Sequence, residues 1–171
     1  CSSDLGFIGG GNMAEAIVSS LLQKKRSIPG AVTVADISPE RRNYLTRTYG
    51  VTATADNTEA ILGSDVIVLA VKPQQMPMVL AEMKGLLADT QLIISIAAGI
   101  RIISITEALG HTGVVRAMPN MPARAGQGIT GWTATPKVTD MQKDRARGIL
   151  GSMGKEIYFD NEADLDKVTA V

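Results

Sequence analysis

Leu5-Gly6-Phe7-Ile8-Gly9-Gly10-Gly11-Asn12-Met13-Ala14 is the stretch that decides the fold, because it predicts a short apolar strand, a glycine-rich turn and the start of a helix. Within it, Gly9-x-Gly11-x-x-Ala14 fits the fingerprint of dinucleotide-binding turns, with alanine in the third small position. Glycine at position 9 allows a sharp turn, and a side chain at position 11 would block the approach of a pyrophosphate. The first amides of the helix lack internal partners and its dipole is positive there, so we expect them to bind a pyrophosphate.

The composition is that of an ordinary globular protein, since 45% of the 171 residues are hydrophobic, 20% are charged and the net charge is zero. A zero net charge gives no electrostatic reason to expect binding to nucleic acid or to an anionic membrane. There is no secretory signal and no run of about 18 or more apolar residues, so we expect a soluble, cytoplasmic protein. One cysteine, Cys1, and one histidine, His111, cannot form a His/Cys metal cluster, and we expect His111 in an exposed turn.

Short apolar runs alternate along the chain with amphipathic segments of helical period. This alternation implies right-handed crossovers and predicts an α/β fold of the Rossmann type, with a doubly wound, mainly parallel sheet and helices on both faces. The sequence predicts an edge strand at 129–134 and a long loop over 118–128, and long irregular loops in compact domains are often functional. The remaining strands are predicted at 5–8, 32–35, 51–54, 66–71, 92–96, 114–117 and 156–159.

Four segments follow directly after predicted strands: the glycine turn, Ser38, Lys72 and Ala98. Ligands of open α/β sheets bind outside the carboxyl ends of the strands, so these segments are expected to meet at one edge. Ser38-Pro39 also has the chemistry of a helix start, with an N-cap serine and proline in the first helical position.

Four motifs, in this order and spacing, resemble the N-terminal half of pyrroline-5-carboxylate reductases. The resemblance covers nearly the whole chain and implies an oxidoreductase of proline biosynthesis, which reduces 1-pyrroline-5-carboxylate to L-proline by hydride transfer from NADPH or NADH. The motifs are Gly6-Phe7-Ile8-Gly9-Gly10-Gly11-Asn12-Met13-Ala14, Ala70-Val71-Lys72-Pro73-Gln74, Ser95-Ile96-Ala97-Ala98-Gly99 and Val115-Arg116-Ala117-Met118-Pro119-Asn120.

The family also has a helical second domain that dimerises and supplies much of the imino-acid pocket. Val168-Thr169-Ala170-Val171 resembles the step that precedes that domain. The resemblance therefore implies an NAD(P)-binding domain over residues 1–160, and a hinge with the start of the helical domain over 161–171. We expect this chain to lack the helical domain, to be weakly active or inactive alone, and to form the homo-oligomer only with that domain.

The resemblance assigns cofactor contacts to positions that match the family's motifs. Asn57 is expected near the adenosine and can equally be a helix N-cap. Lys72 is expected at the nicotinamide ribose or is a solvated lysine, and Asn120 lies near the nicotinamide or is a turn residue. The further expected contacts are Ile8, Gly9, Gly10, Gly11, Asn12 and Met13 at the pyrophosphate, Ala70, Val71 and Pro73 at the nicotinamide ribose, and Ala98 at the nicotinamide.

The choice between NADP(H) and NAD(H) depends on the residues after the second strand. Asp36 stands where an acid usually binds the ribose 2′-hydroxyl of NAD. Ser38 and Arg41, with the adjacent Arg42, follow closely and could bind a 2′-phosphate, although both arginines could also lie on a solvated helix face. Because the family commonly prefers NADPH and tolerates NADH, we expect NADP(H) as the cofactor with NAD(H) as a weaker second.

The sequence offers no Ser/His/Asp or Cys/His arrangement and no defensible pair of carboxylates, so no catalytic residue is predicted. The expected substrate is a small imino acid whose carboxylate is held mostly by the helical domain. Two alternatives remain at this point: another imine or hydroxyacid reductase of similar build, and a non-catalytic dinucleotide-binding module.

Overall fold

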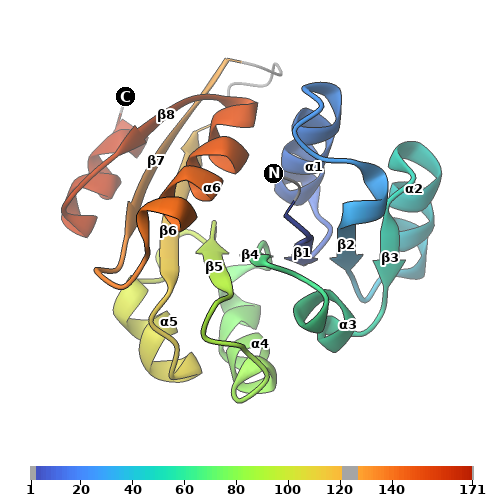
Figure 1. Ribbon diagram of the computed structural model, residues 1–171, viewed down its shortest axis with the longest axis horizontal. Coiled ribbons are helices and arrows are strands. Elements are labelled where there is room, and N and C mark those ends of the chain that lie inside the picture. Colours follow the sequence, from blue (N-terminus) through green and yellow to red (C-terminus); the bar gives the residue numbers. More distant parts are fainter. Residues whose placement is uncertain (1–2, 121–126, 171) are drawn as a thin grey trace.

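Eight strands form one sheet in the order β3-β2-β1-β4-β5-β6-β7-β8 in the computed structural model, which describes residues 3–120 and 127–170 (Figure 1). Every neighbouring pair is parallel except β6 and β7, which are antiparallel. The predicted Rossmann-type fold is confirmed. The strands are β1 (Leu5–Ile8), β2 (Val32–Ala35), β3 (Thr52–Thr54), β4 (Val66–Leu69), β5 (Leu92–Ser95), β6 (Val114–Asn120), β7 (Gly128–Ala134) and β8 (Gly154–Tyr158).

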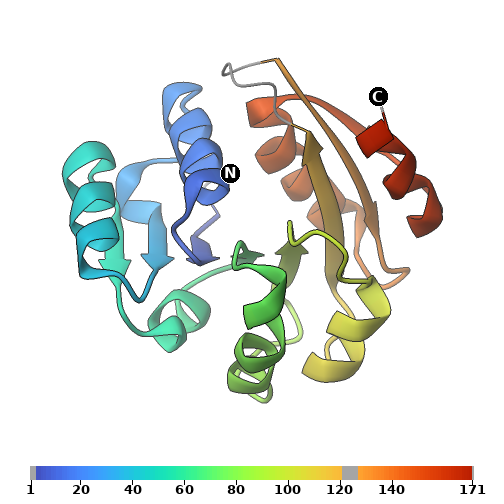
Figure 2. The same cartoon turned by 180° about the vertical axis from the view of Figure 1, so that it is seen from behind.

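Helices cover both faces of the sheet, as expected (Figures 1 and 2). One hydrophobic core joins the sheet to α1, α2 and α6, and the other joins it to α3, α4 and α5. The α-helices are α1 (Asn12–Gln23), α2 (Pro39–Tyr49), α3 (Asn57–Leu62), α4 (Met76–Met83), α5 (Ile102–Leu109) and α6 (Asp140–Leu150). Short 3₁₀ helices are η1 (Pro29–Ala31), η2 (Pro73–Gln75), η3 (Gly151–Met153) and η4 (Glu162–Ala170).

Local chemistry explains where α2 begins and ends. The Ser38 side chain accepts a hydrogen bond from the Arg41 amide at 3.2 Å, and Pro39 is the first helical residue. Gly50 ends the helix with a φ of 73°, in the left-handed region that glycine adopts without a steric penalty. Both ends of this helix were predicted from the sequence.

The last described segment, η4, packs against β6 and β7. Leu165 is fully buried there. The sheet makes room for η4 at Gly131, where an added Cβ would lie 2.8 Å from Val168 Cγ2.

Two predictions about the last strands are wrong. β6 continues through Met118-Pro119-Asn120, so the predicted loop is shorter, and its residues 121–126 lie outside the described residues. Beyond Arg116 the strand pairs with β7 alone, and a strand with one open side tolerates a proline. β7 is no edge strand, because it lies between β6 and β8. The residues of this strand alone gave no information about its neighbours.

The prediction that His111 lies in an exposed turn is also wrong. The side chain is 5% exposed, and its Nε2 lies 2.7 Å from the Gln91 carbonyl oxygen. The Gln91 side chain in turn donates to the carbonyl oxygens of Ile61 and Ser64, each at 2.7 Å. The turn itself is present, since Gly110 has a φ of 61°, but the imidazole points inward and satisfies a buried carbonyl.

Candidate cofactor site

The strand order reverses between β1 and β4, because the chain leaves β1 toward β2 and later returns to β1 on its other side. Hydrogen bonds connect the carboxyl end of β1 to the carboxyl ends of its neighbours β2 and β4. The Gly9 amide donates to the Ala35 carbonyl, and the Ala70 amide donates to the Ile8 carbonyl, each at 2.8 Å. Such a reversal opens a crevice in which α/β proteins bind ligands.

The three glycines of the turn have different physical roles. Gly9 has a φ of 95°, and an added Cβ would lie 2.8 Å from the Ala70 carbonyl oxygen. At Gly10 an added Cβ would lie 2.9 Å from Leu45 Cδ1. At Gly11 no described atom lies within 4 Å of an added Cβ, so this side of the turn is open. The turn therefore folds tightly against the sheet and leaves a free surface at the start of α1.

The start of α1 has no side-chain cap from Gly11, its N-cap residue. The amides of the first helical turn, which begins with Asn12 and Met13, have no partner within the helix and lie at the positive end of its dipole. An anion beside Gly11 would satisfy these donors, which is how helix starts bind phosphate groups.

Asp36 holds the glycine turn and the β2–α2 turn together. Its Oδ2 accepts a hydrogen bond from the Gly10 amide, and its Oδ1 accepts one from the Ser38 amide, both at 2.8 Å. The acid that the sequence suggested as a reader of the ribose 2′-hydroxyl is thus engaged by the backbone of the site.

Arg41 lies beside the glycine turn and not on a solvated helix face, so that alternative is wrong. Its Nε donates to the Gly10 carbonyl, its Nη2 forms an ion pair with Glu15 Oε2, and its guanidinium lies 5.0 Å from the centre of the Tyr44 ring. Arg42 also turns back, and its Nη1 donates to the carbonyl oxygens of Asp36 at 2.9 Å and of the next residue at 3.1 Å. The contacts of Arg41 could not be read from the sequence, because they depend on how α2 lies against the glycine turn and α1.

Glu15 is the centre of a polar cluster behind Arg41. Its Oε1 accepts hydrogen bonds from the Tyr44 and Tyr49 hydroxyls, each at 2.7 Å. Burial raises the pKa of Glu15, but the hydrogen bonds from Tyr44, Tyr49 and Arg41 outweigh it and leave the pKa below its ordinary value. Burial and the bond to Glu15 raise the pKa of Tyr49 to about 12.

A groove of about 230 Å³ runs from the crevice toward α3 and α4. Asn57 donates across it to Glu82 Oε2 at 3.0 Å. The N-cap of α3 is Asp56, whose Oδ1 accepts from the Thr58 amide at 2.9 Å, so the alternative role of Asn57 as an N-cap is wrong. The lining is Ile8, Gly9, Ala35, Asp36, Ile37, Asn57, Val71, Gln75, Met78, Val79 and Glu82.

Sequence reasoning missed the two exposed apolar side chains of this groove. Ile37 is 83% exposed and Met78 is 64% exposed. Met78 lies on α4 outside the set of residues that the helix buries. Ile37 follows directly after Asp36, just beyond the end of β2. These two features were the available signals, and apolar side chains in such positions suit a flat aromatic ligand.

The remaining predicted contacts follow the carboxyl ends of β4, β5 and β6. Ala70 and Val71 are half-buried, whereas Lys72 and Pro73 are exposed at the start of η2. Ala98 and Asn120 are exposed farther along the same edge, after β5 and at the end of β6. The structure thus places the glycine turn, Ser38, Arg41, Asn57 and the segment 70–73 around the crevice, and Ala98 and Asn120 beyond it.

Other kinds of site find little support in the described ranges 3–120 and 127–170. Within them, no three His, Cys, Asp or Glu side chains are grouped so that they could hold a metal ion. No helix in these ranges has both the length and the hydropathy needed to cross a membrane. His111 lies before β6, at the opposite edge of the sheet from the crevice, and so takes no part in the candidate site.

Comparisons with known proteins agree with the motifs. Residues 4–99 match the family described as NADP oxidoreductase coenzyme F420-dependent. A pyrroline-5-carboxylate reductase of Synechocystis sp. is 39% identical over 170 residues, which are 99% of this chain and 63% of the relative. The predicted resemblance to this group of enzymes is confirmed, and the chain spans about 63% of the length of that relative.

Solved structures give the same picture. A pyrroline-5-carboxylate reductase from Coxiella burnetii matches with a TM-score of 0.93 and 39% identity, over 99% of this chain and 63% of that one. A Plasmodium falciparum pyrroline carboxylate reductase with NADP bound matches with a TM-score of 0.86 and 27% identity, over 98% of this chain and 61% of that one. The cofactor class expected from the sequence, NADP, is also the one in the description of the matching family.

Proposed function

The chain belongs to the NADP oxidoreductase coenzyme F420-dependent family, and on that premise we propose that it is the cofactor-binding part of a pyrroline-5-carboxylate reductase. When bound, NADPH would supply the hydride that reduces the imine carbon of 1-pyrroline-5-carboxylate, and a proton added at the imine nitrogen would complete the conversion to L-proline. The residues of this chain bind and orient the cofactor. The observation that carries the proposal is the open turn at Gly11, placed at the reversal of the strand order.

The pyrophosphate of the cofactor is held against the start of α1. The amides near Gly11, Asn12 and Met13 donate to its oxygens, and the helix dipole favours its charge. Ile8, Gly9 and Gly10 form the floor of this subsite, where a tight backbone keeps side chains out of the way. A β-carbon at position 11 would point into the space that the pyrophosphate takes.

The adenosine half of the cofactor occupies the groove beside β2. The exposed apolar side chains of Ile37 and Met78 would hold the adenine, and Asn57 lines the same groove. Ser38 and Arg41 then take the 2′-phosphate, since a hydroxyl and a guanidinium are good partners for a phosphate. This arrangement favours NADPH and leaves NADH as the weaker cofactor.

The nicotinamide half lies along the carboxyl ends of β4, β5 and β6. Ala70, Val71, Lys72 and Pro73 line its ribose, and Lys72 is exposed and free to reach a ribose hydroxyl. Ala98 and Asn120 stand nearer the ring, where the substrate must approach within van der Waals contact for hydride transfer. No side chain of this chain is assigned as the proton donor.

The substrate is a small imino acid, and its carboxylate is held by the part of the relatives' length that this chain does not span. We place the boundary of the cofactor-binding domain near residue 160, with 161–171 as the connection to that part. The homo-oligomer that the resemblance implies, formed with the helical domain, belongs to the same proposal. So does the cytoplasmic location, which was expected from the lack of a secretory signal and of a long apolar run.

The test is enzymatic. A protein extended to the full length of the relatives should form L-proline from 1-pyrroline-5-carboxylate and NADPH, while residues 1–171 alone should bind NADPH with little or no turnover. Full turnover by the 171-residue chain would refute the proposal that the substrate is held by the part that this chain does not span. Reduction of other imines or of keto acids in preference to 1-pyrroline-5-carboxylate by the extended protein would refute the proposed substrate.

A further inference from the structure

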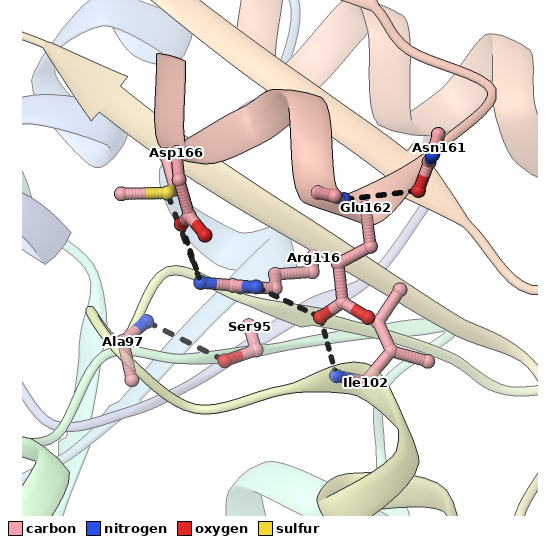
Figure 3. A network of polar contacts seen from close by, with 9 residues as sticks. Ser95, Ala97, Ile102, Arg116, Asn161, Glu162 and Asp166 are labelled. Atoms are coloured by element: carbon pink, nitrogen blue, oxygen red, sulfur yellow. Dashed lines mark hydrogen bonds and ion pairs between the residues drawn. The ribbon is translucent and has the colours of Figure 1, made fainter. Parts of the chain in front are cut away.

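Arg116 is a buried arginine in the middle of β6 (Figure 3). It is 3% exposed, and its register partner on β5 is the fully buried Ser95. A guanidinium out of water needs a compensating charge. Two acids of η4 provide it, since Glu162 Oε1 lies 2.8 Å from Nη1 and Asp166 Oδ1 lies 3.7 Å from Nη2. The charge of β6 is thus balanced by a segment about 50 residues later in the sequence.

The same carboxylate oxygen of Glu162 has a second partner. It accepts a hydrogen bond at 2.8 Å from the amide of Ile102, the first residue of α5 (Figure 3). The N-cap position of α5 is Arg101, whose side chain makes no capping bond. Glu162 therefore caps α5 from a distant segment, and its negative charge is favourable at the positive end of that helix.

These contacts hold the turn between β5 and α5 at both of its ends. At the first end, the Ala97 amide donates to Ser95 Oγ at 3.4 Å, and at the second end the Ile102 amide donates to Glu162. Between them the turn carries Ala98, which is exposed at the carboxyl edge of the sheet. Arg116 lies next to Ser95 in the sheet and holds the carboxylate that fixes the far end.

We propose that Arg116 and Glu162 are positioning residues for the nicotinamide end of the site. Arg116 orients the Glu162 carboxylate, Glu162 fixes the start of α5, and the fixed turn presents Ala98 to the nicotinamide. This inference rests on the proposed function, because it needs a nicotinamide beside Ala98. It assigns η4 a task at the redox end of the site, through the contacts of Glu162 with Arg116 and Ile102.

The exposed pair of Asp164 and Lys167 gives a matched control. Lys167 Nζ lies 2.6 Å from Asp164 Oδ1, on the same segment as Glu162 but outside the network around Arg116. Asp164→Asn removes one negative charge from η4, as Glu162→Gln does, without touching α5 or β6. A general effect of charge on this segment would therefore appear in both variants.

The experiment compares two probes on the same protein: NADPH, and adenosine 2′,5′-bisphosphate, which lacks the nicotinamide half. Glu162→Ala should lower the affinity for NADPH by about tenfold, the usual size for loss of one charged contact. The affinity for the bisphosphate should change by no more than about twofold. The fluorescence of bound NADPH should shift, and the Ile102 amide should exchange with deuterium faster. Glu162→Gln should keep part of the protection of Ile102, because its side-chain oxygen can still accept, and Asp164→Asn should behave like the unmodified chain.

The outcomes separate this inference from the proposed function. If the unmodified chain binds neither probe, the proposed function falls and the inference falls with it. The inference alone is overturned if the unmodified chain binds both probes and Glu162→Ala lowers the affinity for both equally or for neither. Arg116→Met should repeat the NADPH effect. If circular dichroism shows that this variant has lost its fold, the comparison of Glu162→Ala with Asp164→Asn decides the matter.

Discussion

The Gly10 amide donates a hydrogen bond to Asp36 Oδ2 at 2.8 Å, so the acid at the end of β2 holds the glycine turn directly. The other carboxylate oxygen of Asp36 accepts from the Ser38 amide. An acid in this position is expected to discriminate between cofactors by binding or repelling the group on the ribose 2′-carbon. Its engagement with two amides gives it a different task, which is to shape the turn that both cofactors share.

Asp36→Ala should therefore lower the affinities for NADPH and NADH to a similar degree, by about tenfold. The variant loses one charged hydrogen bond to the glycine turn and one to the β2–α2 turn. Calorimetric titration with both cofactors measures this. Asp65→Ala is the control, since Asp65 also accepts a backbone amide, from Asp4 at 2.9 Å, but at the amino edge of the sheet. A loss confined to NADH would instead make Asp36 a reader of the ribose hydroxyl.

Arg41→Ala should lower the affinity for NADPH by about tenfold to a hundredfold, the range for a charged hydrogen bond to a phosphate. The affinity for NADH should fall by much less. A small loss for NADH is expected because Arg41 also donates to the Gly10 carbonyl. Arg47→Ala, in the last turn of the same helix, controls for the removal of a positive charge. Equal losses for the two cofactors would show that Arg41 supports the turn and does not read the phosphate.

The Glu15 cluster predicts a dependence of stability on pH. Because the pKa of Glu15 is lowered in the folded protein, its ionised form stabilises the fold above the ordinary value of 4.5, and this contribution is lost as the pH falls through the lowered pKa. Chemical unfolding should show Glu15→Gln to be less stable than the unmodified chain at neutral pH, with the difference shrinking in acid below 4.5. A difference that stays constant or grows in acid would contradict the assignment of the cluster.

Gly6 should tolerate no side chain, because an added Cβ would lie 2.2 Å from the Ala60 carbonyl oxygen and 2.6 Å from Ser64 Oγ. Gly6→Ala must push α3 away from β1 and should lower the free energy of unfolding by about 1–3 kcal/mol. Gly148→Ala, in α6, is the matched substitution, since apart from the adjoining backbone of the helix itself no described atom lies within 4 Å of its added Cβ. It should be neutral or raise stability by up to about 1 kcal/mol through helix propensity. Equal effects of the two substitutions in thermal unfolding would argue against close packing at Gly6.

The parts of the fold that depend on local chemistry could be predicted from the sequence. The N-cap at Ser38, the stop at Gly50 and the sharp turn at Gly9 each follow from the residue at that position, and the structure has all three. Strand pairing depends on distant segments, and there two predictions failed, the end of β6 and the edge position of β7. Pro119 suggested the end of a strand, although β6 continues past it against β7.

The candidate site was likewise predicted only in part from the sequence. The glycine turn and the segments after the strands were found because their place in an α/β fold is fixed by chain order. The partners of Arg41, the bond from Asn57 to Glu82 and the capping of α5 by Glu162 were not, since each joins residues from different elements. Spacing along the chain carries no information about contacts that form only when helices settle on the sheet.

The central claim is that a cofactor pyrophosphate rests against the bare backbone at Gly11, and NADPH titration of Gly11→Val tests it most directly. Gly30→Val is the control, because it too has open space around the added Cβ but lies in η1, before β2 and away from the crevice. The account predicts that Gly11→Val stays folded and loses NADPH binding by at least about a hundredfold, while Gly30→Val binds like the unmodified chain. Unchanged NADPH affinity in a folded Gly11→Val variant would contradict it.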